Sequence, residues 1–491
     1  MPADSASPAQ DRDDRDDRAV AANDCAAKAS AAPALDAPAL VAELRATFDA
    51  GVTLPVSWRR EQLRGLRRLL VEEEAELLAA LAADLGKPAE EAFLTEIGVV
   101  LAELSNTERN FARWLRPKRV PAGIMLAPAT ASVRREPLGV AFVIAPWNYP
   151  LNLSLTPLIG AIAAGCAAVL KPSELAPATS AALARLVPKH LDPRAIRVVE
   201  GGAPETTALL AERWDTIFYT GNGTVARIIA RAAAEHLTPT TLELGGKSPT
   251  FVDESVDLIA AARRIAWGKF TNAGQTCVAP DYVLATPAAA RVLERELPRA
   301  VEELFGADPA VSKDYGRIVN ERHFDRVSAL LGSGRIVVGG ESDRDARYLA
   351  PTILADVDPA SPVMQEEIFG PVLPILEVAD DAEAIRFIRE REKPLALYVF
   401  SERKAVRRRF LKWTSSGAIT FGLPIAHLSI AALPFGGVGE SGMGSYHGEA
   451  SIRAFSHERG VVAKPMWPET LALAFPPIDP RRMALLRRLM R

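Results

Sequence analysis

This chain of 491 residues has few cysteines and a small net charge. It has three cysteines and six histidines, and its formal net charge is −3. Cys25, Cys166 and Cys277 are too few and too scattered for a disulfide framework, and no histidine belongs to a spaced cluster that would predict a metal site. The small net charge gives no electrostatic reason to expect nucleic acid as a partner. A reducing, cytoplasmic compartment that keeps thiols free is therefore expected.

A long stretch without charge is present, but it does not predict a membrane span. Residues 137–170 contain no charged side chain, and that length would cross a bilayer. Pro146, Pro150 and Pro157 interrupt the stretch. We predict a buried strand, turn, helix and strand of a parallel sheet there.

Large apolar side chains are nearly absent from the N-terminal end. Alternating acidic and basic residues at 11–18 are followed by alanine-rich sequence, so residues 1–36 are predicted to form a disordered tail. The whole chain is 48% hydrophobic and 24% charged, which is typical of a soluble globular enzyme with two or more lobes.

Hydrophobic periodicity predicts an α/β protein. Two amphipathic helices are expected first, at 58–85 and from about 97 to 114. Short apolar strands then alternate with helices, which predicts a doubly wound parallel sheet with ligands at the carboxyl ends of its strands. Its expected strands are 140–145, 167–170, 196–199, 216–219 and 241–244, and its expected helices are 151–165, 177–187, 205–212 and 224–234. A second set of α/β elements is expected from about 253 to 420.

Two short motifs contain side chains suited to covalent catalysis. Cys277 ends the run Gly-Gln-Thr-Cys, and Glu243 lies in Leu-Glu-Leu-Gly-Gly-Lys. A thiolate can add to a carbonyl carbon, and a carboxylate can later activate water to release the acyl group. The alternatives are a buried structural thiol and a salt-bridged carboxylate at a strand end. Cys166 lies in an apolar, alanine-rich run and is predicted to pack in the core.

These motifs have companions that together resemble the aldehyde dehydrogenase superfamily over residues 38–465. The companions are Pro-Trp-Asn-Tyr-Pro at 146–150 and Glu-Glu-Ile-Phe-Gly-Pro at 366–371. The run Pro-Phe-Gly-Gly-Val-Gly at 434–439 makes the chain similar to the class 3 branch, which includes fatty-aldehyde and bacterial coniferyl-aldehyde dehydrogenases.

The resemblance implies a division of the chain into domains. Residues 37–120 and 137–245 would form the NAD(P)-binding domain, on a variant Rossmann fold that lacks the Gly-x-Gly-x-x-Gly fingerprint. Residues 246–436 would form the α/β catalytic domain. Residues 121–136 and 451–491 would form a small oligomerisation arm and C-terminal segment, and a homodimer is expected.

The resemblance also implies a reaction, the oxidation of an aldehyde to a carboxylic acid with NAD(P) and water. Cys277 would be the nucleophile, forming a thiohemiacetal and then a thioester, and Glu243 the general base with a pKa raised by desolvation. Asn148 and the backbone N–H of Cys277 would stabilise the oxyanion. A coenzyme A-acylating dehydrogenase is the first alternative, and Glu243 disfavours it. A non-catalytic structural protein on the same fold is the second.

Several residues match family positions that hold the cofactor. Lys171 and Glu174 resemble the pair at the adenosine ribose, and Glu174 favours NAD, although class 3 members often accept NADP as well. Gly221 would let the backbone approach the pyrophosphate, although Ala226 stands where the family commonly has a second glycine. The remaining matches are Trp147, Glu367 and Phe369, at the nicotinamide side.

The substrate is the least determined part. Class 3 relatives usually have Val-Asn-Asp after the threonine that corresponds to Thr420, and this chain has Phe-Gly-Leu. Candidate pocket residues are apolar or aromatic, which favours aromatic or medium to long aliphatic aldehydes, with coniferyl aldehyde as the leading example; they are Tyr149, Leu153, Trp267 and Phe270. The basic, apolar segment 481–491 is expected to pack on the body or a partner subunit, with peripheral membrane binding as the alternative.

Overall fold

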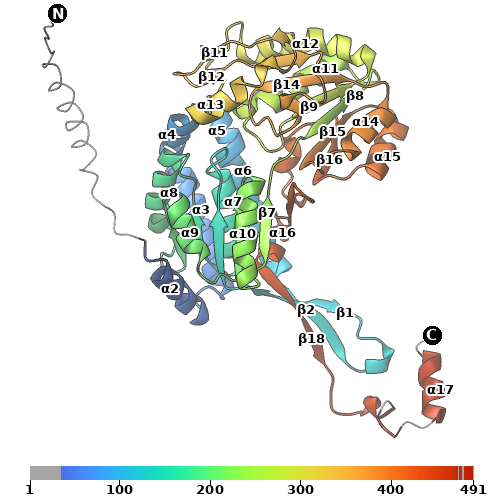
Figure 1. Ribbon diagram of the computed structural model, residues 1–491. Coiled ribbons are helices and arrows are strands. Elements are labelled where there is room, and N and C mark those ends of the chain that lie inside the picture. The colour runs from blue at the N-terminus through green and yellow to red at the C-terminus, as the bar shows by residue number, and fades with distance from the viewer. Residues whose placement is uncertain (1–34, 474, 478–479, 490–491) are drawn as a thin grey trace, which may run out of the picture.

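The computed structural model describes residues 35–473, 475–477 and 480–489. It has two lobes, each built on a largely parallel sheet, and a narrow arm that extends away from them (Figure 1). The predicted tail, residues 1–36, lies outside the described part except for its last two positions.

Helices cover the first lobe before its sheet begins. The prediction of one helix over 58–85 is wrong, because the chain breaks at Glu73. The carboxylate of Glu73 accepts hydrogen bonds from Lys189 and His190, and this contact with a distant helix has no signal in the local periodicity. A helix before residue 58 was also not predicted. The elements are α2 (Ala37–Asp49), α3 (Val56–Glu72), α4 (Glu74–Leu85), α5 (Ala89–Ala92), the π-helix η2 (Phe93–Ile97) and α6 (Gly98–Trp114).

The first sheet has six strands in the order β17-β7-β6-β3-β4-β5, all parallel except β17. The uncharged stretch 137–170 forms a strand, turn, helix and strand that are largely buried, as predicted. The strands are β3 (Val140–Ile144), β4 (Ala167–Lys171), β5 (Ile196–Val198), β6 (Thr216–Thr220), β7 (Thr240–Glu243) and β17 (Gly442–Met443). The helices between them are α7 (Asn152–Ala164), α8 (Pro177–His190), α9 (Ala203–Leu210) and α10 (Gly223–Glu235).

The second sheet has seven strands in the order β10-β13-β14-β9-β8-β15-β16, all parallel except β10. Its strands are β8 (Pro249–Val252), β9 (Tyr282–Ala285), β10 (Arg335–Val338), β13 (Thr352–Ala355), β14 (Val372–Glu377), β15 (Ala396–Phe400) and β16 (Ala418–Phe421). The accompanying helices are α11 (Leu258–Phe270), α12 (Pro287–Phe305), α13 (Glu321–Ser328), α14 (Asp381–Arg389) and α15 (Lys404–Trp413). Only residues 244–248 separate β7 of the first sheet from β8 of the second.

The arm is a three-stranded antiparallel sheet made from segments more than 300 residues apart. It contains β1 (Lys118–Val120), β2 (Thr130–Pro137) and β18 (Ser456–Ala463), which follows α16 (Glu449–Ala454). The basic segment forms α17 (Pro480–Leu489), which lies beyond the tip of the arm, away from both lobes (Figure 1). Among the described residues, no helix is both long and apolar enough to cross a bilayer.

Candidate active site

Cys277 lies on a strained turn that precedes β9. Two non-glycine residues of the turn, Asn272 and Ala273, have φ of 55° and 50°, and Gly274 follows with φ of 74°. The fully buried side chain of Gln275 holds this shape: its amide donates to the carbonyl oxygen of Asn272 at 3.1 Å and accepts from the backbone N–H of Val319 at 2.9 Å. Left-handed conformations of non-glycine residues are retained mainly at functional sites. The thiol of Cys277 itself is half-buried.

Glu243 is the last residue of β7, in the other lobe. Its side chain is 2% exposed, and neither carboxylate oxygen has a hydrogen-bond partner among the described residues. Burial raises the pKa of this carboxyl group well above its usual range. Its charge is close enough to raise the pKa of Cys277 as well. The structure therefore brings the two sequence-predicted groups together from different sheets.

Asn148 joins them from the turn after β3. Its side-chain Nδ2 donates to the carbonyl oxygen of Gln275 at 3.0 Å, two residues before the thiol. An amide nitrogen has two hydrogens, so one remains for a negatively charged oxygen near Cys277. The neighbouring hydroxyl of Tyr149 lies 2.6 Å from Oγ1 of Thr276, which ties the same two segments together.

Glu367 and Phe369 lie on the loop before β14, facing the same region. Oε1 of Glu367 is buried and has no hydrogen-bond partner in the part of the chain that the structure describes, and burial together with Asp281 raises the pKa of this carboxyl group to about 8. Phe369 adopts φ of 47° and packs edge-on against Trp147, with ring centroids 5.3 Å apart. A Cβ at Gly245 would lie 1.9 Å from Oε2 of Glu367, so the glycine makes room for the carboxylate.

Lys171 and Glu174 lie at the end of β4, where Nζ of Lys171 is 3.2 Å from Oε2 of Glu174. Lys171 is buried, whereas the Glu174 side chain is half exposed and available to a ligand. Gly221 follows β6, and its N–H donates to the carbonyl oxygen of Glu243 at 3.0 Å. The helix α10 begins at Gly223, two residues beyond Gly221, so Ala226 lies inside the helix rather than in the turn.

A dinucleotide fits this edge of the first sheet. The predicted cofactor residues lie at the carboxyl ends of β3, β4 and β6 and on the loop that contains Glu367, where open parallel sheets bind ligands. Buried oxygens of Thr220, Glu243 and Glu367 have no partner among the described residues, and buried polar atoms of this kind are normally hydrogen-bonded.

Two features near the site were missed from the sequence. Lys269 is fully buried in α11, and its Nζ has no hydrogen-bond partner among the described residues. Burial lowers the pKa of Lys269 to about 8, with the charge of Asp281 opposing that shift. A single cation among the apolar residues at 265–270 was a signal that could have been noticed. The second feature, a buried pair of Lys87 and Glu96, has no such signal.

A cavity of about 250 Å³ lies between the start of α6 and the segment 428–431. Desolvation lowers the pKa of His447 to about 4, so its ring is uncharged near neutrality, and desolvation raises the pKa of Glu103. Tyr446 packs edge-on against His447, with ring centroids 4.5 Å apart, and the charges of Glu243 and Cys277 add to the burial that raises the pKa of Tyr446. The lining of the cavity is Leu94, Gly98, Val99, Ala102, Glu103, Leu428, Ser429, Ala431 and His447. Of the predicted pocket residues, Phe270 is fully buried in the core and Trp267 is 40% exposed.

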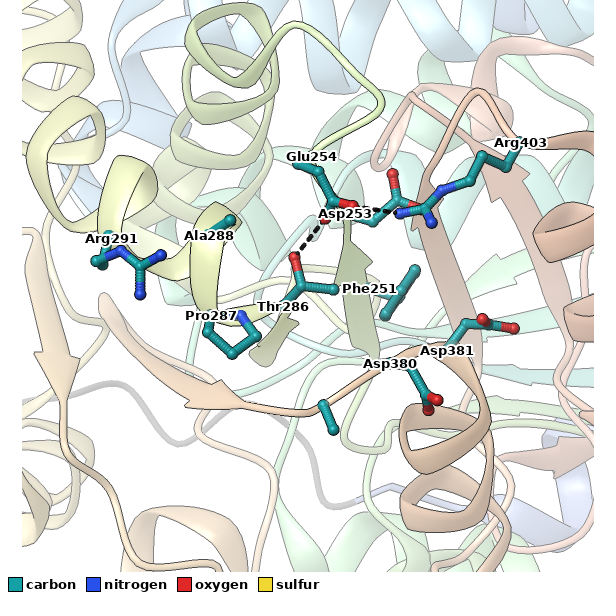
Figure 2. Close-up of a pocket in the computed structure, with 11 residues that line it drawn as sticks. Phe251, Asp253, Glu254, Thr286, Pro287, Ala288, Arg291, Asp380, Asp381 and Arg403 are labelled. Atoms are coloured by element: carbon teal, nitrogen blue, oxygen red, sulfur yellow. Dashed lines mark hydrogen bonds and ion pairs between the residues drawn. The ribbon is translucent and has the colours of Figure 1, made fainter.

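A larger pocket of about 430 Å³ contains none of the predicted site residues. It lies at the carboxyl ends of β8, β9 and β14 (Figure 2), whereas Cys277 precedes β9 and so lies at the opposite edge of that sheet. Its acidic groups already have partners: Arg403 binds both Asp253 and Glu254, and Asp381 binds Arg409. The reactive groups therefore define the candidate active site, and the larger volume does not.

Known proteins are similar to this chain over most of its length. The aldehyde dehydrogenase family matches residues 9–461. A rat dimeric NADP-preferring aldehyde dehydrogenase is 47% identical over 90% of this chain and 98% of its own length. Human aldehyde dehydrogenase family 3 member B1 is 48% identical over 90% of this chain and 95% of its own. The substrate-bound structure of Staphylococcus aureus AldH superposes with a TM-score of 0.89 at 41% identity, covering 92% of this chain and 99% of that one.

Proposed function

Because the chain belongs to the aldehyde dehydrogenase family, in its class 3-like branch, and oxidises aldehydes with NAD(P), we propose that Cys277 is the nucleophile and Glu243 the base of that reaction. One observation carries the assignment: the carboxylate of Glu243 is buried without a hydrogen-bond partner among the described residues, and its charge acts on Cys277. An unpaired buried carboxylate is costly to a fold, and a base that must take a proton from water has that character.

The first chemical step forms a carbon–sulfur bond. Burial and the charges of Glu367 and Glu243 raise the pKa of the Cys277 thiol, so the resting group is a neutral thiol. Its proton passes to a nearby carboxylate as sulfur attacks the aldehyde carbon. The carbonyl oxygen becomes negatively charged, and the free hydrogen of the Asn148 amide and the backbone N–H of Cys277 stabilise it.

The residues between the first sheet and the loop before β14 would hold the cofactor. Lys171 and Glu174 would bind its adenosine ribose, Gly221 would admit the pyrophosphate, and Glu367, Phe369 and Trp147 would position its nicotinamide end. When bound there, the nicotinamide supplies the acceptor for the hydrogen that leaves the aldehyde carbon with its electron pair. We propose NAD as the preferred cofactor because the exposed carboxylate of Glu174 would repel a 2′-phosphate.

The second step releases the acid. Glu243 removes a proton from water, the resulting hydroxide attacks the thioester carbon, and sulfur leaves to regenerate Cys277. A coenzyme A-acylating reaction needs no base for water, so the retained Glu243 favours hydrolysis. A non-catalytic structural role is disfavoured by the same groups, since it needs neither an unpaired carboxylate nor a strained turn beside a thiol.

We further propose aromatic or medium to long aliphatic aldehydes as substrates, with coniferyl aldehyde as the leading example. The cavity beside His447 is mainly apolar, and desolvation lowers the pKa of His447 to about 4, so this ring carries no positive charge near neutrality. Such a lining favours an uncharged chain or ring over a carboxylate-bearing semialdehyde, which needs a cation.

We also propose that the protein is a cytoplasmic homodimer. The assembly is supported by the name of the rat relative, a dimeric enzyme, and by β18 and β16, each of which has an edge that pairs with no other described strand. The location is supported by the free thiol on which the reaction depends.

Single-turnover kinetics test the catalytic assignment. Cys277→Ala should abolish NADH formation while the dissociation constant of NAD stays within about threefold of wild type. Glu243→Gln should give one burst of NADH equal to the enzyme concentration and then stall, with an acyl adduct on Cys277 visible by intact mass. Steady turnover near the wild-type rate in either variant would contradict it, and kcat/KM measured with both NAD and NADP decides the cofactor.

A further inference from the structure

An ion pair outside the reacting groups is buried as deeply as any part of the core. Nζ of Lys87 lies 2.6 Å from Oε1 of Glu96, and both side chains are 0% exposed. Replacing such a pair with apolar residues of similar volume often leaves a protein equally or more stable. Its presence in this fold therefore calls for a role other than stability.

The pair holds the turn that contains Asn148 from both sides. Nζ of Lys87 donates to the backbone carbonyl oxygen of Asn148 at 3.2 Å. Oε2 of Glu96 accepts from the backbone N–H groups of Leu151 and Asn152, at 3.1 and 2.8 Å, where α7 begins. The cation thus binds a carbonyl and the anion binds the N-terminus of a helix, which is the favourable polarity at both contacts.

The same carbonyl is also tied to the turn that precedes Cys277. Nδ2 of Asn272 donates to the backbone oxygen of Asn148 at 2.8 Å, and Nδ2 of Asn148 donates in return to the backbone oxygen of Gln275 at 3.0 Å. The ammonium group of Lys87 also lies 4.2 Å from the ring centroid of Tyr149. The position of the Asn148 amide relative to the thiol therefore depends on one carbonyl with two donors, and Lys87 is the charged donor.

The local backbone is unusual where Glu96 lies. Glu96 belongs to η2, a single π-helical turn between two α-helices. Such turns are rare and recur at functional sites. The turn and the buried charge occur together, on a segment that holds no group of the proposed reaction.

We propose that Lys87 and Glu96 are positioning residues for the oxyanion site, fixing the backbone of Asn148 so that its free amide hydrogen points at the oxygen that becomes charged. The inference rests on the proposed role of Asn148. It predicts that loss of the pair slows formation of the carbon–sulfur bond and leaves cofactor binding unchanged.

A double-mutant cycle tests it. The neutral variant Lys87→Met/Glu96→Gln removes both charges of the pair, and the amide oxygen introduced at position 96 still accepts from the start of α7. The rate of its single-turnover NADH burst, which measures acylation, should be about tenfold to a hundredfold lower than that of wild type. A loss of this size is expected when the Asn148 amide is displaced by about 1 Å. The equilibrium dissociation constant of NAD, measured by direct binding, should not change. In an Asn148→Ala background the same two substitutions should slow the remaining burst less than threefold, because they act through Asn148.

Three outcomes separate the inference from the function on which it rests. If Asn148→Ala leaves the burst rate unchanged, the proposed role of Asn148 fails. If Asn148→Ala slows the burst and Lys87→Met/Glu96→Gln does not, or slows it equally in both backgrounds, the positioning role alone is wrong. Should the double variant not fold, Lys87→Arg keeps the charge pair but moves the donor, and a wild-type burst rate in that variant would overturn the inference.

The exposed pair of Arg68 and Glu61, 3.0 Å apart on α3, provides the matched control. Arg68→Met/Glu61→Gln should have the burst rate of wild type.

Discussion

The carboxyl groups of Glu367 and Glu243 influence the protonation of the Cys277 thiol. Glu367 and Glu243 raise the pKa of the thiol, and burial raises the pKa of both carboxyl groups. A free thiolate beside two carboxylates would be repelled by them. Attack and proton transfer are therefore coupled, and the pH dependence of acylation belongs to the whole group rather than to Cys277 alone.

Lys269 is a buried cation, and its burial makes the free energy of unfolding depend on pH. Its pKa of about 8 in the folded protein lies below the usual 10.5. Between these two values the unfolded chain holds a proton that the folded chain has lost, so stability rises with pH through this window. Below it, the buried ammonium costs about 3 kcal/mol.

Lys269→Met should therefore stabilise the protein at pH 7.5 by up to about 3 kcal/mol. The gain should shrink toward zero by about pH 10.5, because the neutral amine of wild type no longer carries the penalty. The difference in urea midpoint between variant and wild type, measured at both pH values, checks this. Lys313 is exposed, so Lys313→Met serves as the control and should show no pH-dependent difference. A difference for Lys269→Met that is constant with pH would contradict the expectation.

At the scale of elements, the turn before Cys277 and the loop before β14 touch through one glycine. Gly274 has φ of 74°, and a Cβ there would lie 2.3 Å from the carbonyl oxygen of Gly370. A left-handed φ alone costs a non-glycine residue roughly 1–2 kcal/mol. The clash adds to this and would push the thiol away from the loop that contains Glu367.

Gly274→Ala should lower kcat by about a hundredfold, the effect of a displacement near 1 Å in a catalytic group, and should also lower the melting temperature. Steady-state rates and thermal unfolding measure the two effects. Gly332 has open space around its Cβ position and no positive φ, so Gly332→Ala should behave as wild type. If Gly274→Ala retains full kcat, the close contact between the two loops is not needed for the reaction.

Periodicity predicted the first sheet well because its elements are local. Each strand from β3 to β6 is a short, largely apolar run, and each is followed by a turn and a helix within the same window. The break at Glu73 was not predicted, because it depends on a contact with Lys189 and His190. A bend set by tertiary contacts leaves no trace in a local pattern.

The reactive groups could be anticipated because each lies in a short, distinctive motif. Cys277, Glu243 and Asn148 are far apart in the chain, and the expectation that they meet came from the resemblance. The Lys87–Glu96 pair was missed because its proposed role depends on the hydrogen bond from Lys87 to the backbone of Asn148, which lies 61 residues further along the chain. Lysine and glutamate side chains are ordinarily exposed, so the residue types alone predicted the opposite of burial.

At the scale of the molecule, the arm offers an edge for assembly. β18 is the outer strand of the arm, its side chains are mostly exposed, and Val462 is 63% exposed. Unpaired strand edges with exposed apolar residues readily pair with another chain.

Val462→Asp should therefore shift the proposed dimer toward monomer by at least tenfold in its dissociation constant, because it places a charge in an apolar interface. Sedimentation velocity over a concentration series measures this. Ile259 is 50% exposed on α11, so Ile259→Asp is the matched control and should leave the assembly unchanged. A wild-type protein that is monomeric, or a Val462→Asp variant that dimerises equally well, would show that the arm is not the interface.

The nucleophile and the base belong to different lobes joined by the short segment 244–248. Glu243 and Asn148 extend from the first sheet, whereas Cys277 belongs to the second. Any rotation of one lobe against the other separates the groups of both chemical steps at once, while each sheet keeps its own hydrogen bonds. Turnover therefore depends on the docking of the two lobes. On heating, we expect enzymatic activity to disappear before the circular dichroism signal of the protein's secondary structure changes.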